Sequence, residues 1–184
     1  MKKNYRMTKR DDLILRHIAM YQMSTFEAIR HLFFENRRPD AAKSTLRRLG
    51  KNGMGLIASE HITGTQKVYY RLTPKGGELL GIPSRRCKRL GDSKLPQCYA
   101  VLWFTCFSEP SIERTICNPR DYPGVFSFGN QRIPKIDFYI ANHKTETAPG
   151  SGISFGFAMT DFDSRPRRIV DPVSYTHLRA HETR

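Results

Sequence analysis

The stretch RRPDAAKSTLRRLGK, residues 37–51, decides how the rest of the chain is interpreted. If it forms a helix, Ala42, Leu46 and Leu49 lie along one side, because residues three and four apart share a helix face. The other side carries the polar and basic residues Lys43, Ser44, Arg47 and Lys51. Pro39 suits the first helical position, and Asp40 lies where the helix dipole favours an anion. The stretch therefore predicts a helix with one packed face and one basic face.

Two more helices are expected before this one. In residues 8–21, helical spacing aligns a stripe of five side chains, with Asp11 and Asp12 in the first turn: Leu13, Ile14, His17, Ile18 and Tyr21. Ser24 and Glu27 match a capping box, which predicts a second helix starting at Ser24. That helix is expected to bury Ile29, Leu32 and Phe33. Residues 36–38 then form the turn before Pro39, since a residue before proline avoids helical geometry.

A β-hairpin and a short helix are expected after residue 51. Residues 55–62 and 66–72 are rich in β-forming side chains, and Thr63-Gly64-Thr65 between them has the length of a hairpin tip. In the second segment Val68, Tyr70 and Leu72 alternate with Lys67, Tyr69 and Arg71. The alternation predicts one apolar face and one face that carries cations and an aromatic ring. Thr73 and Pro74 are typical of an N-cap and first helical position, although Gly76 and Gly77 weaken the following helix.

Three helices, a hairpin and a further helix with short connections are the ingredients of a winged helix-turn-helix domain. We therefore expect an α+β protein whose winged helix covers residues 8–82. Residues 83–91, PSRRCKRLG, are either a solvated basic linker or an additional arm that contacts phosphates. A small α+β domain is expected over 92–171, with a helix opening at Pro96 and strands over 136–141 and 153–160.

The positive charge lies in the first half of the chain. The net charge is +14 over 184 residues, and residues 1–91 hold 20 Lys and Arg against 7 Asp and Glu. Residues 92–171 are balanced at 9 against 9. A basic half of this kind favours a partner rich in phosphates, although membrane surfaces and solubility also select positive charge.

The composition argues against several other classes. No run approaches the ~20 apolar residues of a membrane-spanning helix, and no apolar stretch follows Met1-Lys2-Lys3, so we expect a cytoplasmic protein that does not bind membranes. The four cysteines have neither a C-x-x-C pair nor a histidine at zinc-finger spacing. We expect reduced, mostly buried thiols and neither a metal site nor a cofactor.

Residues 56–81, LIASEHITGTQKVYYRLTPKGGELLG, resemble the wing and following helix of MarR-like winged-helix domains. With the three preceding helices, residues 8–82 resemble the replication-relaxation family of plasmid and conjugative-element proteins. The resemblance implies a regulator of transcription, or an accessory factor in replication or mobilisation, whose partner is double-stranded DNA. A second copy of the chain and a mobilisation or replication protein are further candidate partners.

The expected DNA contacts follow from side-chain chemistry. A recognition helix lies in the major groove, where the guanidinium fork of Arg47 matches the edge of guanine. Lys43, Ser44 and Lys51 would contact DNA from the same face. Phosphate contacts are expected from Arg37, Arg38 and Arg48. Thr65 and Lys67 at the tip of the wing would reach either an adjacent minor groove or a phosphate.

Two alternatives concern the second domain. In replication-relaxation proteins this half can resemble a restriction-endonuclease-like core, and Asp137 with Asp161 or Asp163 would hold its metal. Neither Asp161 nor Asp163 has a lysine two positions later, so the motif is degenerate and we assign no catalytic residue and no enzymatic activity. The other alternative is a protein-interaction module, with Trp103 and Phe107 in the core or at its surface.

The end of the chain is set apart from the fold. Residues 173–183, VSYTHLRAHET, match one reading frame of a transposase-type sequencing adapter. We therefore exclude residues 172–184 as an adapter-derived artefact and expect the second domain to be truncated.

Overall fold

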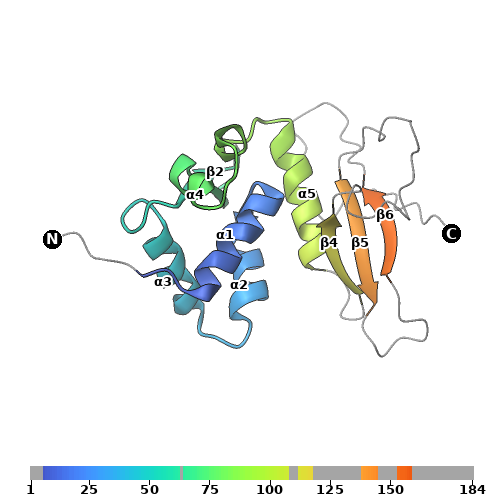
Figure 1. The fold of residues 1–184 in the computed structure, drawn as a ribbon, viewed down its shortest axis with the longest axis horizontal. Helices are drawn as coiled ribbons and strands as arrows, with labels where there is room; N and C mark the ends of the chain where they lie inside the picture. Colours follow the sequence, from blue (N-terminus) through green and yellow to red (C-terminus); the bar gives the residue numbers. More distant parts are fainter. Residues whose placement is uncertain (1–5, 63, 108–111, 118–137, 145–152, 159–184) are drawn as a thin grey trace. The chain divides into compact units, whose positions relative to one another are not determined.

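A computed structural model describes residues 6–62, 64–107, 112–117, 138–144 and 153–158. The chain has both helices and strands, as an α+β protein requires (Figure 1). It divides into two compact units, Met1–Tyr99 and Ala100–Arg184. The 3-10 turn η1 (Ser84–Cys87) belongs to the first unit, and helix α5 (Lys94–Cys106) runs across the division.

Three helices open the first unit: α1 (Lys9–Tyr21), α2 (Phe26–Phe34) and α3 (Pro39–Leu49). Pro39 occupies the first turn of α3, as its fixed φ favours. Ala42, Leu46 and Leu49 are buried, so the predicted division of α3 into a packed and an exposed face is confirmed. As predicted, residues 36–38 precede the helix, whereas Lys51, which was expected on its basic face, follows the helix end.

The cap of α2 differs from the prediction. Thr25, and not Ser24, is the N-cap residue, and its hydroxyl accepts a hydrogen bond from the amide of Ala28. Ser24 pairs with Tyr70 in the two-residue strand β1 (Ser24–Thr25), while its Oγ lies 3.0 Å from Nε2 of His17. The capping box of the first unit is at α1 instead, between Thr8 and Asp11.

Strands β2 (Ile57–His61) and β3 (Val68–Leu72) form the expected antiparallel hairpin, and β1 joins the other edge of β3. The face that carries Lys67, Tyr69 and Arg71 is not the exposed side of the hairpin that the alternation suggested, because Tyr69 is fully buried. Arg71 shares the face of Tyr69 and donates a 2.8 Å hydrogen bond to the carbonyl of Cys87. Residues after α4 (Pro74–Leu79) therefore cover this face of the hairpin, which an alternating pattern does not reveal.

The segment 83–91 is not a solvated linker. Cys87 belongs to the apolar core of the first unit, and Leu90 is also buried. Arg86 donates to the carbonyl of Ala19 at the end of α1, over 3.2 Å. Buried apolar side chains and hydrogen bonds thus fix a stretch that composition alone presents as a charged connector.

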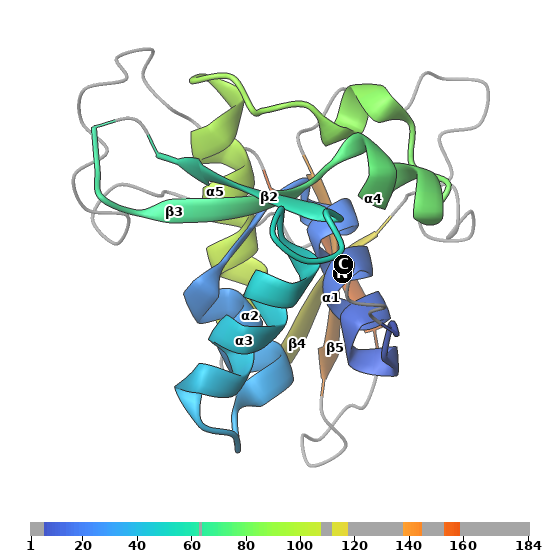
Figure 2. The same ribbon diagram turned by 90° about the vertical axis from the view of Figure 1, so that its left-hand side faces the viewer.

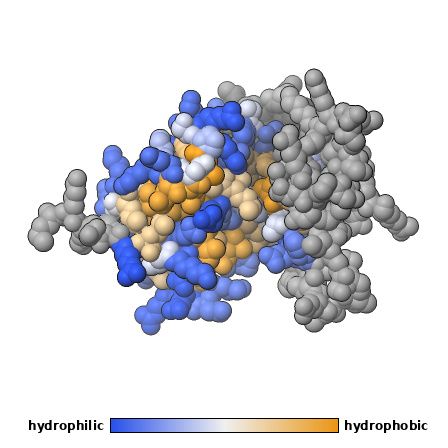
Figure 3. Space-filling model, viewed as in Figure 1, coloured by the Kyte–Doolittle hydropathy of each residue, from blue (hydrophilic) through white to orange (hydrophobic). Residues whose placement is uncertain are grey.

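Two apolar residues expected to pack are exposed. Leu13 on α1 retains 46% of its accessible surface and Leu32 on α2 retains 42%. Leu15 and Phe34 are buried in the core instead. Figure 3 shows apolar residues gathered over α1 and α2 on the face seen in Figure 1.

In the second unit, β4 (Ile112–Cys117), β5 (Phe138–Lys144) and β6 (Ile153–Ala158) form an antiparallel sheet in the order β4-β5-β6. The sequence predicted β5 and β6 but not β4. The guanidinium of Arg114 on β4 lies 4.4 Å from the ring centre of Phe104 on α5, and Trp103 stacks on Phe107. Asp137, Asp161, Asp163 and residues 172–184 lie outside the described residues.

The four cysteines are free thiols, and Cys87, Cys98 and Cys106 are buried, as predicted. In the part of the chain that the structure describes, no helix has the length and apolar character needed to cross a membrane.

His17 makes the first unit sensitive to acid. Its imidazole lies near the rings of Tyr21 and Phe33, and burial lowers its pKa from 6.5 to about 4. The unfolded chain therefore takes up a proton before the folded chain does. The free energy of unfolding should fall by up to about 1.4 kcal/mol per pH unit as the pH drops from 6.5 toward 4.

Urea unfolding of the wild type and of His17→Gln, each at pH 7 and pH 5, measures this contribution. The variant lacks the titrating imidazole, so its stability should change less between the two pH values. Equal pH dependence in both proteins would contradict the assignment to His17.

Candidate nucleic-acid interface

The exposed face of α3 carries a row of cations. Lys43 and Arg47 lie one turn apart with Ser44 between them, and Lys51 follows just beyond the helix end. All four side chains are exposed. Lys43 lies 3.8 Å from Asp40, and this pair is weak because both groups face solvent. Within the described part of the chain, Arg47 and Lys51 form no hydrogen bond or ion pair, so their charges are available to a ligand.

The turn before α3 adds Arg37 and Arg38, which are exposed and likewise have no polar side-chain partner among the described residues. Arg38 is the N-cap residue of α3, so its backbone is fixed by the start of the helix. These two arginines and the row on α3 form one continuous run of the chain, as the sequence predicted.

The hairpin is tied to the end of α3. The amide of Leu56 donates to the carbonyl of Leu49 over 2.8 Å, which connects the last residue of α3 to the approach to β2. The hydroxyl of Thr73 donates to the carbonyl of Gly55 over 2.7 Å, so the strand leaving the hairpin is held at the same place. Figure 2 shows α3 below the hairpin, whose tip extends to one side.

At the hairpin tip, the two predicted contact residues differ. The hydroxyl of Thr65 donates to the carbonyl of Ile62 and accepts from the amide of Lys67, each over 3.1 Å. Thr65 thus closes the turn. Lys67 is exposed and its amine has no partner among the described residues, so it is the better candidate for contact with a ligand.

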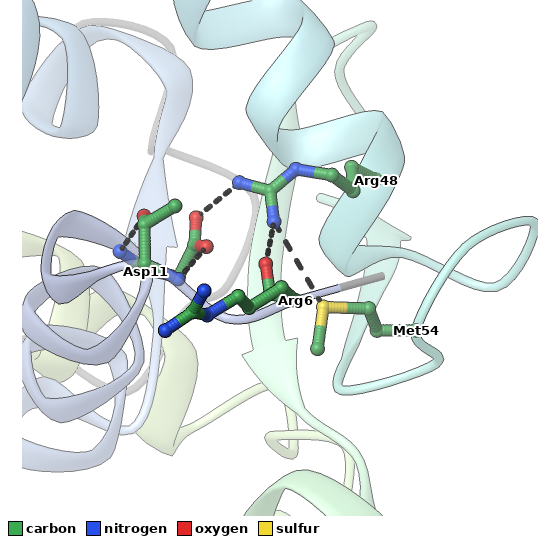
Figure 4. Close-up of polar contacts among 5 residues, drawn as sticks. Arg6, Asp11, Arg48 and Met54 are labelled. Atoms are coloured by element: carbon green, nitrogen blue, oxygen red, sulfur yellow. Dashed lines mark hydrogen bonds and ion pairs between the residues drawn. The ribbon is translucent and has the colours of Figure 1, made fainter. Parts of the chain in front are cut away.

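Arg48 does not belong with the exposed cations. Its Nη2 donates to Oδ1 of Asp11 over 2.5 Å, and the Asp11 side chain is 1% exposed (Figure 4). Nη1 also approaches the carbonyl of Arg6 and the sulfur of Met54. Arg48 therefore joins α3 to the first turn of α1, and its predicted role as a phosphate contact is not supported by its position.

Asp11 is the residue of this region that sequence reasoning missed. Burial alone would raise the pKa of its carboxyl, but hydrogen bonds from Arg48 and Thr8 outweigh burial and hold the pKa below 3.8. The capping motif at Thr8 and Asp11 was visible in the sequence, whereas the ion pair with a residue 37 positions away was not.

No group of three His, Cys, Asp or Glu side chains in the described ranges is arranged to hold a metal ion. The site is thus a set of cations on a helix, its preceding turn and a hairpin. Such a set can bind anions by charge and hydrogen bonding.

Comparison of the chain with protein-family models, with curated proteins and with solved structures gave no match. The function has to be inferred from the residues and their geometry.

Proposed function

We propose that residues 8–82 form a winged helix-turn-helix domain that binds double-stranded DNA in a sequence-specific manner. Helices α1, α2 and α3, the hairpin β2–β3 and helix α4 follow one another in the order of such a domain. In this proposal α3 is the recognition helix and the hairpin is the wing. The resemblance to replication-relaxation proteins favours a regulator or accessory factor of a mobile element.

The observation that carries the proposal is the unneutralised cationic row on α3. A solvated helix face in a soluble protein usually mixes both signs of charge. Here the only acidic residue on α3 is Asp40, at its first turn, and it faces Lys43. Arg47 and Lys51 remain without a counter-charge. The phosphates of a DNA duplex would supply this counter-charge, since a duplex carries one negative charge per ~1.7 Å of helix axis.

The two halves of the site have different tasks. Arg47 lies in the last turn of α3, on the exposed face of a helix that can enter the major groove, where its guanidinium can bind guanine O6 and N7 together. Lys67 extends from the wing toward the phosphate backbone, which is the same in every sequence. Arg37 and Arg38 are assigned to phosphates at the start of α3.

The test uses a duplex that the full chain selects from a random-sequence pool, together with an unrelated duplex. Arg47→Ala should weaken binding to the selected duplex by roughly 10- to 100-fold and leave the unrelated duplex little affected, because a bidentate contact discriminates by about 1–3 kcal/mol. Lys67→Ala should weaken binding to both duplexes and reduce the slope of log K against log salt by about 0.9.

Arg16→Ala is the control for loss of one positive charge, since Arg16 is exposed on α1 and paired with Asp12. Titrations by fluorescence anisotropy from 50 to 300 mM NaCl would measure all three variants. The proposal fails if Arg47→Ala and Lys67→Ala behave like Arg16→Ala on both duplexes.

A further inference from the structure

A second basic surface lies outside the proposed site. Residues 85–89 hold four cations and no acid: Arg85, Arg86, Lys88 and Arg89. The segment is held in place on both sides of Lys88, because Cys87 is 1% exposed and Leu90 is 8% exposed. These cations therefore extend from ordered backbone.

Hydrogen bonds fix the same backbone. Arg71 on the hairpin donates to the carbonyl of Cys87 over 2.8 Å, and Arg71 is itself held by Glu60 on the neighbouring strand. Arg86 is bonded to the carbonyl of Ala19. A cation on a fixed backbone loses less conformational entropy on binding than one on a flexible linker.

Arg85, Lys88 and Arg89 are exposed, and none of them has a hydrogen-bond or ion-pair partner in the described part of the chain. Arg89 interacts electrostatically with the phenol of Tyr69, which leaves Arg85 and Lys88 as the members with unused charge.

Within residues 83–89 the exposed residues are polar or charged, apart from Pro83. Leu79 at the end of the neighbouring helix α4 is an exposed apolar side chain. Four cations without an acid nevertheless favour a polyanion over a folded protein, whose interface would have an apolar or aromatic centre. A polyanion requires only cations in fixed positions.

The segment lies away from the recognition helix. Arg48 of α3 contacts α1 at Asp11, whereas Arg86 contacts α1 at Ala19. Eight residues of α-helix separate these points by about 12 Å. Figure 2 shows α4, which leads into the segment, on the side of α3 opposite the hairpin tip. The segment itself packs on the hairpin where Arg71 of β3 meets the carbonyl of Cys87.

We propose that Arg85 and Lys88 form a second phosphate-binding site, which contacts the backbone of the same duplex outside the base pairs that face α3. This inference rests on the proposed function. The two contact points on α1 are about 12 Å apart, which is the length of a few base pairs at 3.4 Å each. The contact carries no base recognition, because both side chains would meet only phosphates.

The test compares two duplexes with the full chain. One is the short selected site and the other is the same site with about ten extra base pairs on each side. The double variant Arg85→Ala/Lys88→Ala should bind the long duplex about tenfold more weakly at 0.2 M salt and lower its salt slope by about 1.8. Its affinity for the short duplex should equal that of the wild type. The exchange variant Arg85→Lys/Lys88→Arg retains both charges and should bind like the wild type.

Equal affinity of wild type and double variant on the long duplex would overturn the proposal, as would an equal loss on both duplexes. Sedimentation would show how many duplexes each chain binds. If the double variant lost affinity only in complexes that hold two duplexes per chain, the segment would contact a second DNA molecule, and the proposal would also be overturned. Arg47→Ala and Lys67→Ala, measured beside these variants, distinguish a failure of the second phosphate-binding site from a failure of the proposed DNA-binding function. If those variants behave as expected, a negative result concerns only Arg85 and Lys88; if they have no effect, the proposed function itself fails.

Discussion

Replacing Asp11 with alanine is expected to lower the free energy of unfolding by about 3–5 kcal/mol, because it leaves the partly buried guanidinium of Arg48 without its counter-charge. The carboxylate is 1% exposed and accepts from both Arg48 and the amide of Thr8. The variant therefore loses the ion pair and half of the capping box together. Urea unfolding followed by circular dichroism would measure the loss.

The neighbouring acid supplies a matched control. Asp12 pairs with Arg16 on the exposed side of the same helix turn, with 32% and 65% of the two side chains exposed. Exposed pairs of this kind contribute at most about 1 kcal/mol, so Asp12→Ala should change stability little. If Asp11→Ala and Asp12→Ala lowered the free energy of unfolding by similar amounts, the Asp11–Arg48 pair would contribute no more to stability than an exposed ion pair.

A double-mutant cycle with Arg48→Met isolates the pair. Each single variant leaves one charge uncompensated, whereas the double variant leaves none, so it should be more stable than the sum of the single losses predicts. Additive losses would contradict the coupling. Where Asp11→Ala is too unstable to purify, Asp11→Asn keeps the side-chain size and removes only the charge.

The same pair predicts acid sensitivity in a range separate from that of His17. The pKa of Asp11 is lowered in the folded state, so its stabilisation is present above pH 3.8 and is lost as the pH falls through the folded-state pKa. Asp11→Asn should remove this part of the acid transition and leave the part between pH 6.5 and 4 in place.

Helical periodicity in the sequence was sufficient to predict which side chains are buried where a single helix packs against the core. The burial of Ala42, Leu46 and Leu49 follows from spacing that any single helix would show. The same spacing cannot separate Arg47 from Arg48, which are adjacent residues of the same chemistry. Asp11, which another helix contributes, pairs with Arg48 and leaves Arg47 exposed.

The other differences between the sequence-based predictions and the structure also arise from tertiary contacts. Ser24 and Thr25 are equally good caps by residue type. The hydroxyl of Ser24 lies 3.0 Å from Nε2 of His17, and the hydroxyl of Thr25 caps α2. Tyr69 is buried because residues 87–90 cover the hairpin, although the composition of residues 83–91 predicted either a solvated linker or an arm that contacts phosphates. Local patterns identify elements, and contacts between distant residues decide which side chains stay available to a ligand.

Gly76 gives the second large effect, and its direction is opposite to the one that helix propensity predicts. Alanine is favoured over glycine by about 1 kcal/mol inside a helix, so Gly76→Ala in α4 would be expected to stabilise the protein. The structure places Gly76 against the backbone of Leu56, where an added Cβ would overlap the carbonyl oxygen. That carbonyl also accepts a hydrogen bond from the amide of Thr73, so it cannot shift without loss. We expect Gly76→Ala to lower the free energy of unfolding by about 2–3 kcal/mol.

Gly91→Ala is the matched control, because an added Cβ there would meet no atom within 4 Å and the residue is not among the glycines with positive φ. Its stability in urea should stay within about 0.5 kcal/mol of the wild type. Since Leu56 joins α3 to the hairpin, a shift at Gly76 would also move the proposed wing relative to the recognition helix. Gly76→Ala should therefore weaken DNA binding even under conditions where it is fully folded. A variant as stable as the wild type would show that α4 does not pack against Leu56 as closely as the structure places it.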